Sequence, residues 1–308
     1  MIHLRLALEY FVPWTNDAGY QVAIARGWYR DAGLDVRQVL IDPLFGDTLD
    51  YLAAGEAEIG VFPTNRLFVR REAGEKLLGV AAVNHRGMET IQSLVGAGIS
   101  RPRDLAGRRI ALNPTPRGLA MVRHLVAADG GDPDSLIIVD SGSLEINADH
   151  LDDGFADAFF GAYWAWDALI GSVPEEQRVI WPVDEIGAPP YHSYLLGLRE
   201  ELAEREPQAV RDFLAVTERG FRAAREEPEA ALEVLLTTIP YVPEALLRRS
   251  LGLISPTWFH EDRWGIQREE LHQPYAQWLA DNGILNDVAI WTEATTDEFL
   301  PTESGAEK

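Results

Sequence analysis

Apolar and polar residues follow two different periods along the first part of the chain. The first 62 residues contain three short runs typical of strands and, between them, two stretches with the apolar spacing of a helix. In chain order these segments are residues 4–11, 20–32, 34–41, 47–54 and 58–62. Such an order of strands and helices predicts parallel strands joined by right-handed helical crossovers.

The same pattern resumes further along the chain and then changes. Helices and strands are predicted at residues 66–73, 77–84, 109–112, 118–129, 137–139 and 155–160. From Pro207 to about Gly283 the apolar spacing is helical, so helices dominate the last third of the chain. The predicted fold class is therefore α/β, with two sets of α/β units and a C-terminal helical region.

Chain length and net charge restrict the number of lobes and the kinds of partner. The chain has 308 residues, of which 46% are hydrophobic. This length exceeds the usual size of a domain with a single core and favours two lobes. There are 49 acidic against 27 basic residues, and the net charge of -22 repels phosphate backbones and anionic lipid head groups. No apolar run is long enough to cross a bilayer. We therefore expect no nucleic-acid partner and no membrane insertion of this chain.

Cysteine is absent, which excludes disulfides, thiolate nucleophiles and cysteine-ligated zinc. No phosphate-binding loop, dinucleotide glycine motif or metal-ligand spacing occurs, so no cofactor and no metal are expected. Residues 1–8 pass directly into the first predicted strand, without a basic region, a long apolar segment or a cleavage site. We expect either an extracytoplasmic protein whose export signal is missing from this sequence, or a cytoplasmic protein.

Several short motifs recur in order over nearly the whole chain. They are residues 25–36, 52–60, 98–110, 161–167, 185–191 and 296–301. With them the chain resembles the thiamine-pyrimidine branch of the periplasmic-binding-protein superfamily, whose related branches bind alkanesulfonates, taurine or nitrate. The resemblance implies a two-lobed type II fold with two interlobe crossovers. Lobe 1 would comprise residues 1–88 and 193–308, and lobe 2 residues 89–192.

The resemblance also implies a function. The chain would be the substrate-binding component of an ABC importer, closing around a small heterocycle, with a thiamine-related pyrimidine as the first expectation and an ABC permease as partner if exported. The alternative is a cytoplasmic enzyme or ligand sensor on the same scaffold. Against a pyrimidine synthase of the yeast type, Phe62 and Arg66 stand at the positions of its cofactor-binding lysine and sacrificial histidine.

Ligands in such folds meet the loops after parallel strands, which selects the loop after the first strand. It contains Tyr10, Phe11, Trp14, Asn16 and Asp17, and its rings are suited to stack on a flat heterocycle. The alternative is that one or more of these rings, Phe11 in particular, belongs to the core.

Two further loops supply polar candidates. Thr64 and Asn65 follow the third strand and either bind the polar edge of a ring or cap the next helix. Thr115 and Arg117 lie in a strand-to-helix turn suited to a carboxylate, phosphate or carbonyl oxygen. The alternative for that turn is a rigid proline-rich connection with a solvated arginine.

The last candidates follow an apolar strand. Tyr163, Trp164, Trp166 and Asp167 match a family motif that carries aromatic residues and a glutamate, with Asp167 at the glutamate position. Its carboxylate would accept from the amino group of an aminopyrimidine and share a proton with the ring nitrogen. The alternative is an aspartate in the first turn of a helix. Tyr191 matches the family's late aromatic residue and either forms the opposite wall or braces the hinge.

Overall fold

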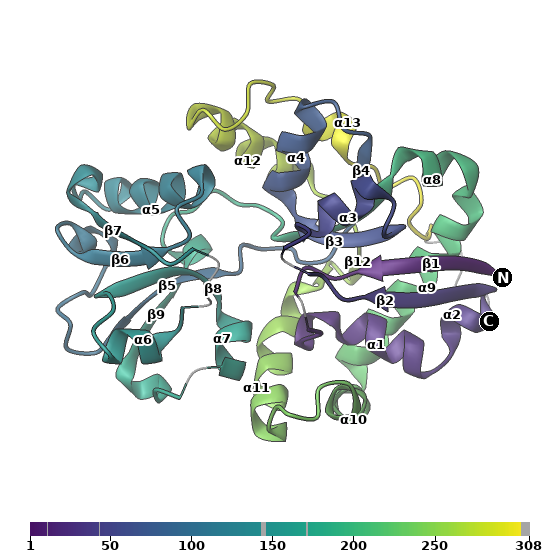
Figure 1. Ribbon diagram of the computed structural model, residues 1–308, viewed down its shortest axis with the longest axis horizontal. Coiled ribbons are helices and arrows are strands. Elements are labelled where there is room, and N and C mark those ends of the chain that lie inside the picture. The colour runs from purple at the N-terminus through teal and green to yellow at the C-terminus, as the bar shows by residue number, and fades with distance from the viewer. Residues whose placement is uncertain (11, 43, 143–145, 171, 303–308) are drawn as a thin grey trace. The chain divides into compact units, whose positions relative to one another are not determined.

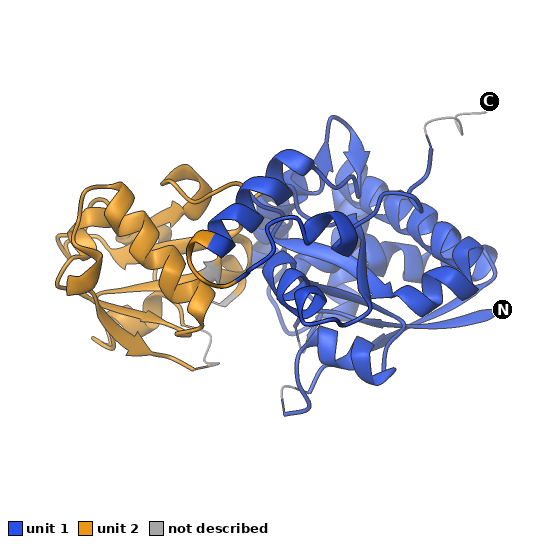
Figure 2. Cartoon of the chain, turned by 90° about the horizontal axis from the view of Figure 1, so that it is seen from above, with its two compact units in different colours: residues 1–85, 191–280, 285–308 blue, residues 86–190, 281–284 orange. Residues whose placement is uncertain are grey.

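The chain folds into two compact units, each built on its own sheet (Figures 1 and 2). The computed structural model describes residues 1–10, 12–42, 44–142, 146–170 and 172–302. Unit 1 comprises Met1–His85, Tyr191–Ala280 and Leu285–Lys308, and unit 2 comprises Arg86–Pro190 and Asp281–Ile284. Both sheets are packed with helices, which confirms the predicted α/β class.

Unit 1 contains a five-stranded sheet in the order β2-β1-β3-β10-β4. The strands are β1 (Ile2–Ala7), β2 (Leu34–Val39), β3 (Ile59–Pro63), β4 (Leu77–Ala82) and β10 (Tyr194–Arg199). β1 pairs in parallel with both β2 and β3, as the sequence predicts, and β10 runs antiparallel between β3 and β4. Because β2 and β3 lie on opposite sides of β1, the chain reverses its direction across the sheet between β1 and β3, which makes this a topological switch point.

Helices of unit 1 connect the strands and then form the late helical region. The connecting helices are α1 (Ala18–Ala25), α2 (Trp28–Asp31), α3 (Thr48–Ala54) and α4 (Thr64–Glu72). The late elements are α8 (Glu200–Arg205), α9 (Pro207–Glu226), α10 (Pro228–Thr238), α11 (Glu244–Ile254), β11 (Phe259–His260), β12 (Arg263–Trp264), α12 (Glu269–Asp281) and α13 (Trp291–Ala294). The predicted dominance of helices in the last third is therefore confirmed.

Two glycines bring α1 and α9 into close contact. A Cβ atom at Gly220 would lie 2.2 Å from the carbonyl oxygen of Gly19, and a Cβ at Gly19 would lie 2.3 Å from the Phe221 ring. Phe221 is fully buried and contacts the Tyr20 ring edge to face. The absence of side chains at both positions lets the backbones of these helices meet, which attaches the late helical region to the first helix of the unit.

Unit 2 contains the second sheet, in the order β7-β6-β8-β5-β9. Its strands are β5 (Glu89–Leu94), β6 (Arg109–Leu112), β7 (Ile137–Asp140), β8 (Ala158–Tyr163) and β9 (Arg178–Pro182), and its helices are α5 (Pro116–Ala128), α6 (Ala148–Asp152) and α7 (Trp164–Ile170). β6 is parallel to β7 and β8, whereas β5 runs antiparallel between β8 and β9. The strand predicted at residues 155–160 lies about three residues later, because Gly154 and Phe155 close the turn after α6.

Candidate functional site

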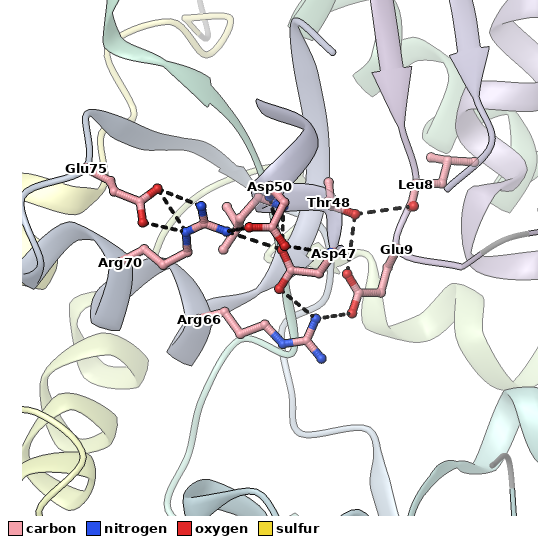
Figure 3. Close-up of polar contacts among 9 residues, drawn as sticks. Leu8, Glu9, Asp47, Thr48, Asp50, Arg66, Arg70 and Glu75 are labelled. Carbon is pink, nitrogen blue, oxygen red and sulfur yellow. Dashed lines mark hydrogen bonds and ion pairs between the residues drawn. The ribbon is translucent and has the colours of Figure 1, made fainter. Parts of the chain in front are cut away.

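The candidate site lies at the switch point of unit 1, where the loop after β1 meets the first turns of α3 and α4 (Figure 3). Glu9 lies two residues after the end of β1, and its Oε1 accepts a hydrogen bond from Nη1 of Arg66 at 3.0 Å. The Thr48 hydroxyl donates to the Leu8 carbonyl at 3.3 Å and lies 3.5 Å from Oε2 of Glu9. Ligands of open α/β sheets bind at this position.

A glycine in β3 sets how close α3 comes to this point. A Cβ atom at Gly60 would lie 2.4 Å from Cγ2 of Thr48, so only glycine lets the first turn of α3 press against the strand. Asp47 caps α3 by accepting a hydrogen bond from the Leu49 amide at 2.9 Å, and the Asp50 carboxylate accepts one from the Asp47 amide at 2.8 Å. The local sequence therefore fixes the start of α3 beside Glu9.

Two arginines one helical turn apart on α4 tie it to α3. Arg66 reaches Asp47 at 3.2 Å as well as Glu9, while Arg70 reaches Asp50 at 2.8 Å. Arg70 is also bound by Glu75 at 2.7 Å. These ion pairs hold the two helix starts together and orient the guanidinium of Arg66 toward Glu9 (Figure 3).

Glu9 differs in protonation from ordinary carboxylates. Burial raises its pKa to about 7; the positive charge of Arg66 opposes this shift, and the negative charge of Asp47 adds to it. A carboxyl group poised near neutrality both donates and accepts hydrogen bonds. Such groups are concentrated at functional sites.

Two aromatic candidates of the first loop contact each other. Tyr10 is half-buried and contacts Trp14 edge to face, with ring centroids 5.7 Å apart. Trp14 is 2% exposed, so it supports Tyr10 from inside the unit. Phe11 lies outside the described residues.

Asn16 and Asp17 are both buried in unit 1. Oδ1 of Asn16 accepts from the Trp258 indole and from Asn84, each at 2.9 Å, and its amide donates to Asn84 at 3.1 Å. Asp17 accepts from the Trp14 amide at 3.0 Å, and burial raises the pKa of Asp17 to about 7 against that hydrogen bond. Both side chains therefore hold the loop in place, and their contact with ligand stays a prediction.

Thr64 and Tyr191 are also engaged internally. Thr64 is buried and donates to the His192 carbonyl at 2.7 Å, and Asn65 beside it is half-buried. Neither caps α4, because the capping position is Pro63. Tyr191 is buried and stacks on Tyr275, with ring centroids 4.6 Å apart.

In unit 2 the turn before α5 has defined internal partners. Thr115 caps α5 by accepting from the Gly118 amide at 3.1 Å. Arg117 forms an ion pair with Glu89 at the start of β5. Glu89 and Arg117 are 14% and 11% exposed, so the guanidinium is not a fully solvated one.

The aromatic motif of unit 2 spans the end of β8 and the start of α7. Tyr163 and Trp164 are half-buried, and the Arg86 guanidinium lies 4.8 Å from the Trp164 ring. Trp166 is buried. These rings remain predicted ligand contacts.

Asp167 lies in the first turn of α7 and is 2% exposed. It forms an ion pair with Arg178, the first residue of β9, whose side chain is 5% exposed. Burial raises the pKa of Asp167, and the positive charge of Arg178 opposes this shift. The sequence motif selected Asp167 for the ligand, but it contains no signal for this buried partner.

Sequence reasoning missed Glu9, although a signal was present. A charged residue lies two positions after the end of the first strand, at the point where the strand order reverses. In the sequence, Arg66 is distinguished only by standing where another enzyme has a histidine. Their pairing depends on the neighbouring positions of β1 and β3, which no local pattern reports.

No helix of the described part of the chain is long and apolar enough to cross a membrane. Over the same residues, no group of three or more histidine, aspartate or glutamate side chains is placed to hold a metal ion.

Comparison with solved structures defines the class of fold as that of the type II periplasmic binding proteins. The aliphatic sulphonate binding protein of Escherichia coli covers 96% of this chain and 97% of its own, with a TM-score of 0.73 at 14% identity. The desulfurization enzyme DSZB covers 97% of both chains, with a TM-score of 0.67 at 14% identity. The predicted two-lobed fold is confirmed, and the same fold occurs in a binding protein and in an enzyme.

The sequence matches the family described as NMT1/THI5 like over residues 14–231, and the chain belongs to that family. The formylaminopyrimidine-binding protein of Halalkalibacterium halodurans is 25% identical over 234 residues, which is 75% of this chain and 70% of that protein. The family resemblance inferred from the ordered motifs is thereby confirmed.

Proposed function

We propose that this protein is the solute-binding component of an ABC importer and that its ligand is a small heterocycle of the thiamine-related pyrimidine class. The Glu9–Arg66 pair at the switch point carries the proposal, because it offers hydrogen-bond donors and acceptors to a polar ring edge. The similarity to a formylaminopyrimidine-binding protein favours the pyrimidine class.

The residues at the positions of the synthase lysine and histidine favour binding over catalysis. Phe62, at the position of the synthase lysine, is 1% exposed in the core of unit 1, and Arg66 is held in ion pairs. A buried phenyl ring cannot form the Schiff base that such a reaction requires. We infer that the protein holds its ligand unchanged, acts outside the cytoplasmic membrane and delivers the ligand to an ABC permease.

The test is a thermal-shift screen of the full chain, combined with mass spectrometry of the recovered compounds. The panel contains formylaminopyrimidine, hydroxymethylpyrimidine, thiamine, taurine and an alkanesulfonate. A ligand of the native state at about 100 times its Kd stabilises the protein by roughly 2.7 kcal/mol, so a melting shift is expected with a pyrimidine. Recovery of the intact pyrimidine is also expected. A shift with sulfonates alone would refute the ligand class, and a converted pyrimidine would refute the receptor function.

A matched pair of variants locates the site. Arg66→Met is expected to abolish most of the pyrimidine shift, because it removes the partner of Glu9. Arg101→Met is the control, since Arg101 has a similar exposure, 47% against 44%, and forms an ion pair with Asp129 in unit 2. Equal shifts in the two variants would exclude the switch point as the ligand site.

A further inference from the structure

The side chains of Arg66 and Arg70 and their four carboxylate partners, Glu9, Asp47, Asp50 and Glu75, form the switch-point network. Glu9 is its most buried carboxyl group. Its side chain is 13% exposed, compared with 30% for Asp47, 43% for Asp50 and 35% for Glu75. A carboxylate loses more hydration at such a position than its neighbours do, and the loss must be offset by hydrogen bonds.

The carboxylates of Asp47 and Glu75 accept more hydrogen bonds than the carboxyl of Glu9 does. Asp47 accepts from backbone amides and from two arginines, and Glu75 is chelated by Arg70. Oε1 of Glu9 accepts a hydrogen bond from Arg66. Among the described residues, the only donor to Oε2 is the Thr48 hydroxyl at 3.5 Å, the limit of a hydrogen bond. One oxygen of this buried carboxyl therefore keeps accepting capacity that the protein does not use.

We propose that Glu9 is the specificity-determining residue of the site and that its carboxyl binds an amidine-type edge, in which an exocyclic amino group adjoins a ring nitrogen. The inference rests on the proposed function, and it names the chemical group by which the ligand is selected. One carboxyl oxygen accepts from the amino group, and the other shares a proton with the ring nitrogen. Arg66 stabilises the pair when the proton lies on the ring.

The local charges support this assignment. Because burial raises the pKa of Glu9 to about 7, its proton is available for sharing near neutral pH. Asp167, which the sequence motif selects for the same task, is 2% exposed and paired with an arginine that is 5% exposed, whereas Arg66, the partner of Glu9, is 44% exposed. An oxo group in place of the amino group removes the donor and the basic ring nitrogen, so the charge-assisted bond is lost.

The experiment measures the affinity of one aminopyrimidine and of its oxo analogue by calorimetry. The proteins are the wild type, Glu9→Gln, Glu9→Met and the control Glu58→Gln, which removes a carboxylate that is 20% exposed and paired with Arg5, outside this network. The wild type and Glu58→Gln are expected to prefer the amino compound by about 10- to 100-fold, the range of a charge-assisted hydrogen bond. Glu9→Gln is expected to bind both compounds within about threefold of each other, because an amide pairs with either edge without charge. Glu9→Met is expected to lose at least tenfold in affinity for the amino compound.

The outcomes separate the two proposals. A wild-type protein that binds neither pyrimidine would overturn the proposed function and this inference with it. Pyrimidine binding with the same amino preference in Glu9→Gln as in the wild type would overturn only the role of Glu9. Melting curves of the unliganded variants show whether each one folds, and Glu9→Gln, which keeps the size of the side chain, remains informative if Glu9→Met does not fold.

Discussion

Replacement of Asp167 by alanine would leave the Arg178 guanidinium charged, buried and without its partner. The two side chains are 2% and 5% exposed, so water cannot take the place of the lost carboxylate. Among the described residues, Nε of Arg178 has no hydrogen-bond partner even in the intact pair. The ion pair is therefore incompletely satisfied, and its loss exposes the full desolvation cost of the arginine.

The expected cost of Asp167→Ala is about 3–5 kcal/mol of unfolding free energy, the range for breaking a buried ion pair from one side. For a chain of 308 residues this corresponds to a fall in melting temperature of about 5–8 °C, measured by thermal denaturation followed by circular dichroism. The control is Asp157→Ala in the same unit, since Asp157 and Arg109 are 28% and 44% exposed. An exposed pair of this kind contributes about 1 kcal/mol or less.

The double variant Asp167→Leu with Arg178→Met separates stability from binding. Replacement of both charges by apolar side chains is expected to recover most of the stability, because neither partner is left buried and charged. If Glu9 selects the ligand, the double variant keeps its pyrimidine affinity within a factor of about three. A single variant no less stable than Asp157→Ala would refute the reasoning on stability. Loss of affinity in a well-folded double variant would assign the ligand to Asp167.

Three further predictions concern unit 1. Asn16→Ala removes the acceptor of the buried Trp258 indole and is expected to cost about 1–3 kcal/mol in urea denaturation; an unchanged midpoint would contradict the buried network. Gly220→Ala forces a methyl group against the Gly19 carbonyl and is expected to cost about 1–3 kcal/mol, whereas a neutral result would mean that α1 and α9 do not meet there. Burial lowers the pKa of His272 to about 3, so the folded protein keeps this side chain neutral at pH values where the unfolded chain protonates it. The resulting loss of stability is absent above the unfolded pKa of about 6.5 and grows as the pH falls toward 3. Between pH 6 and 4 the wild type should therefore lose about 1.4 kcal/mol per pH unit more than His272→Leu, and parallel stability curves would refute this.

Local patterns in the sequence were sufficient for the elements and the class of fold. The three parallel strands of unit 1 follow from alternating or continuous apolar runs that end at turn residues, because strand periodicity and turn chemistry act over a few neighbouring residues. The family follows from short motifs in a fixed order, which survive because they mark helix ends and strand starts. β9 was not predicted: its residues are all half-buried at the edge of the sheet, so they lack a clear alternation.

The partners of the polar side chains were decided only by the tertiary structure. Asn16 pairs with Asn84 and Trp258, 68 and 242 residues away, and Glu9 pairs with Arg66, 57 residues away. These contacts depend on the order β2-β1-β3 and on the return of the late helices to unit 1. Whether a carboxyl group is held in an internal ion pair or keeps an oxygen for a ligand is a matter of burial and neighbouring charge. The sequence by itself determined which carboxyl groups exist and near which strand ends they lie. The assembled fold decided their surroundings, because hydration is lost and charges are paired only when distant segments pack together.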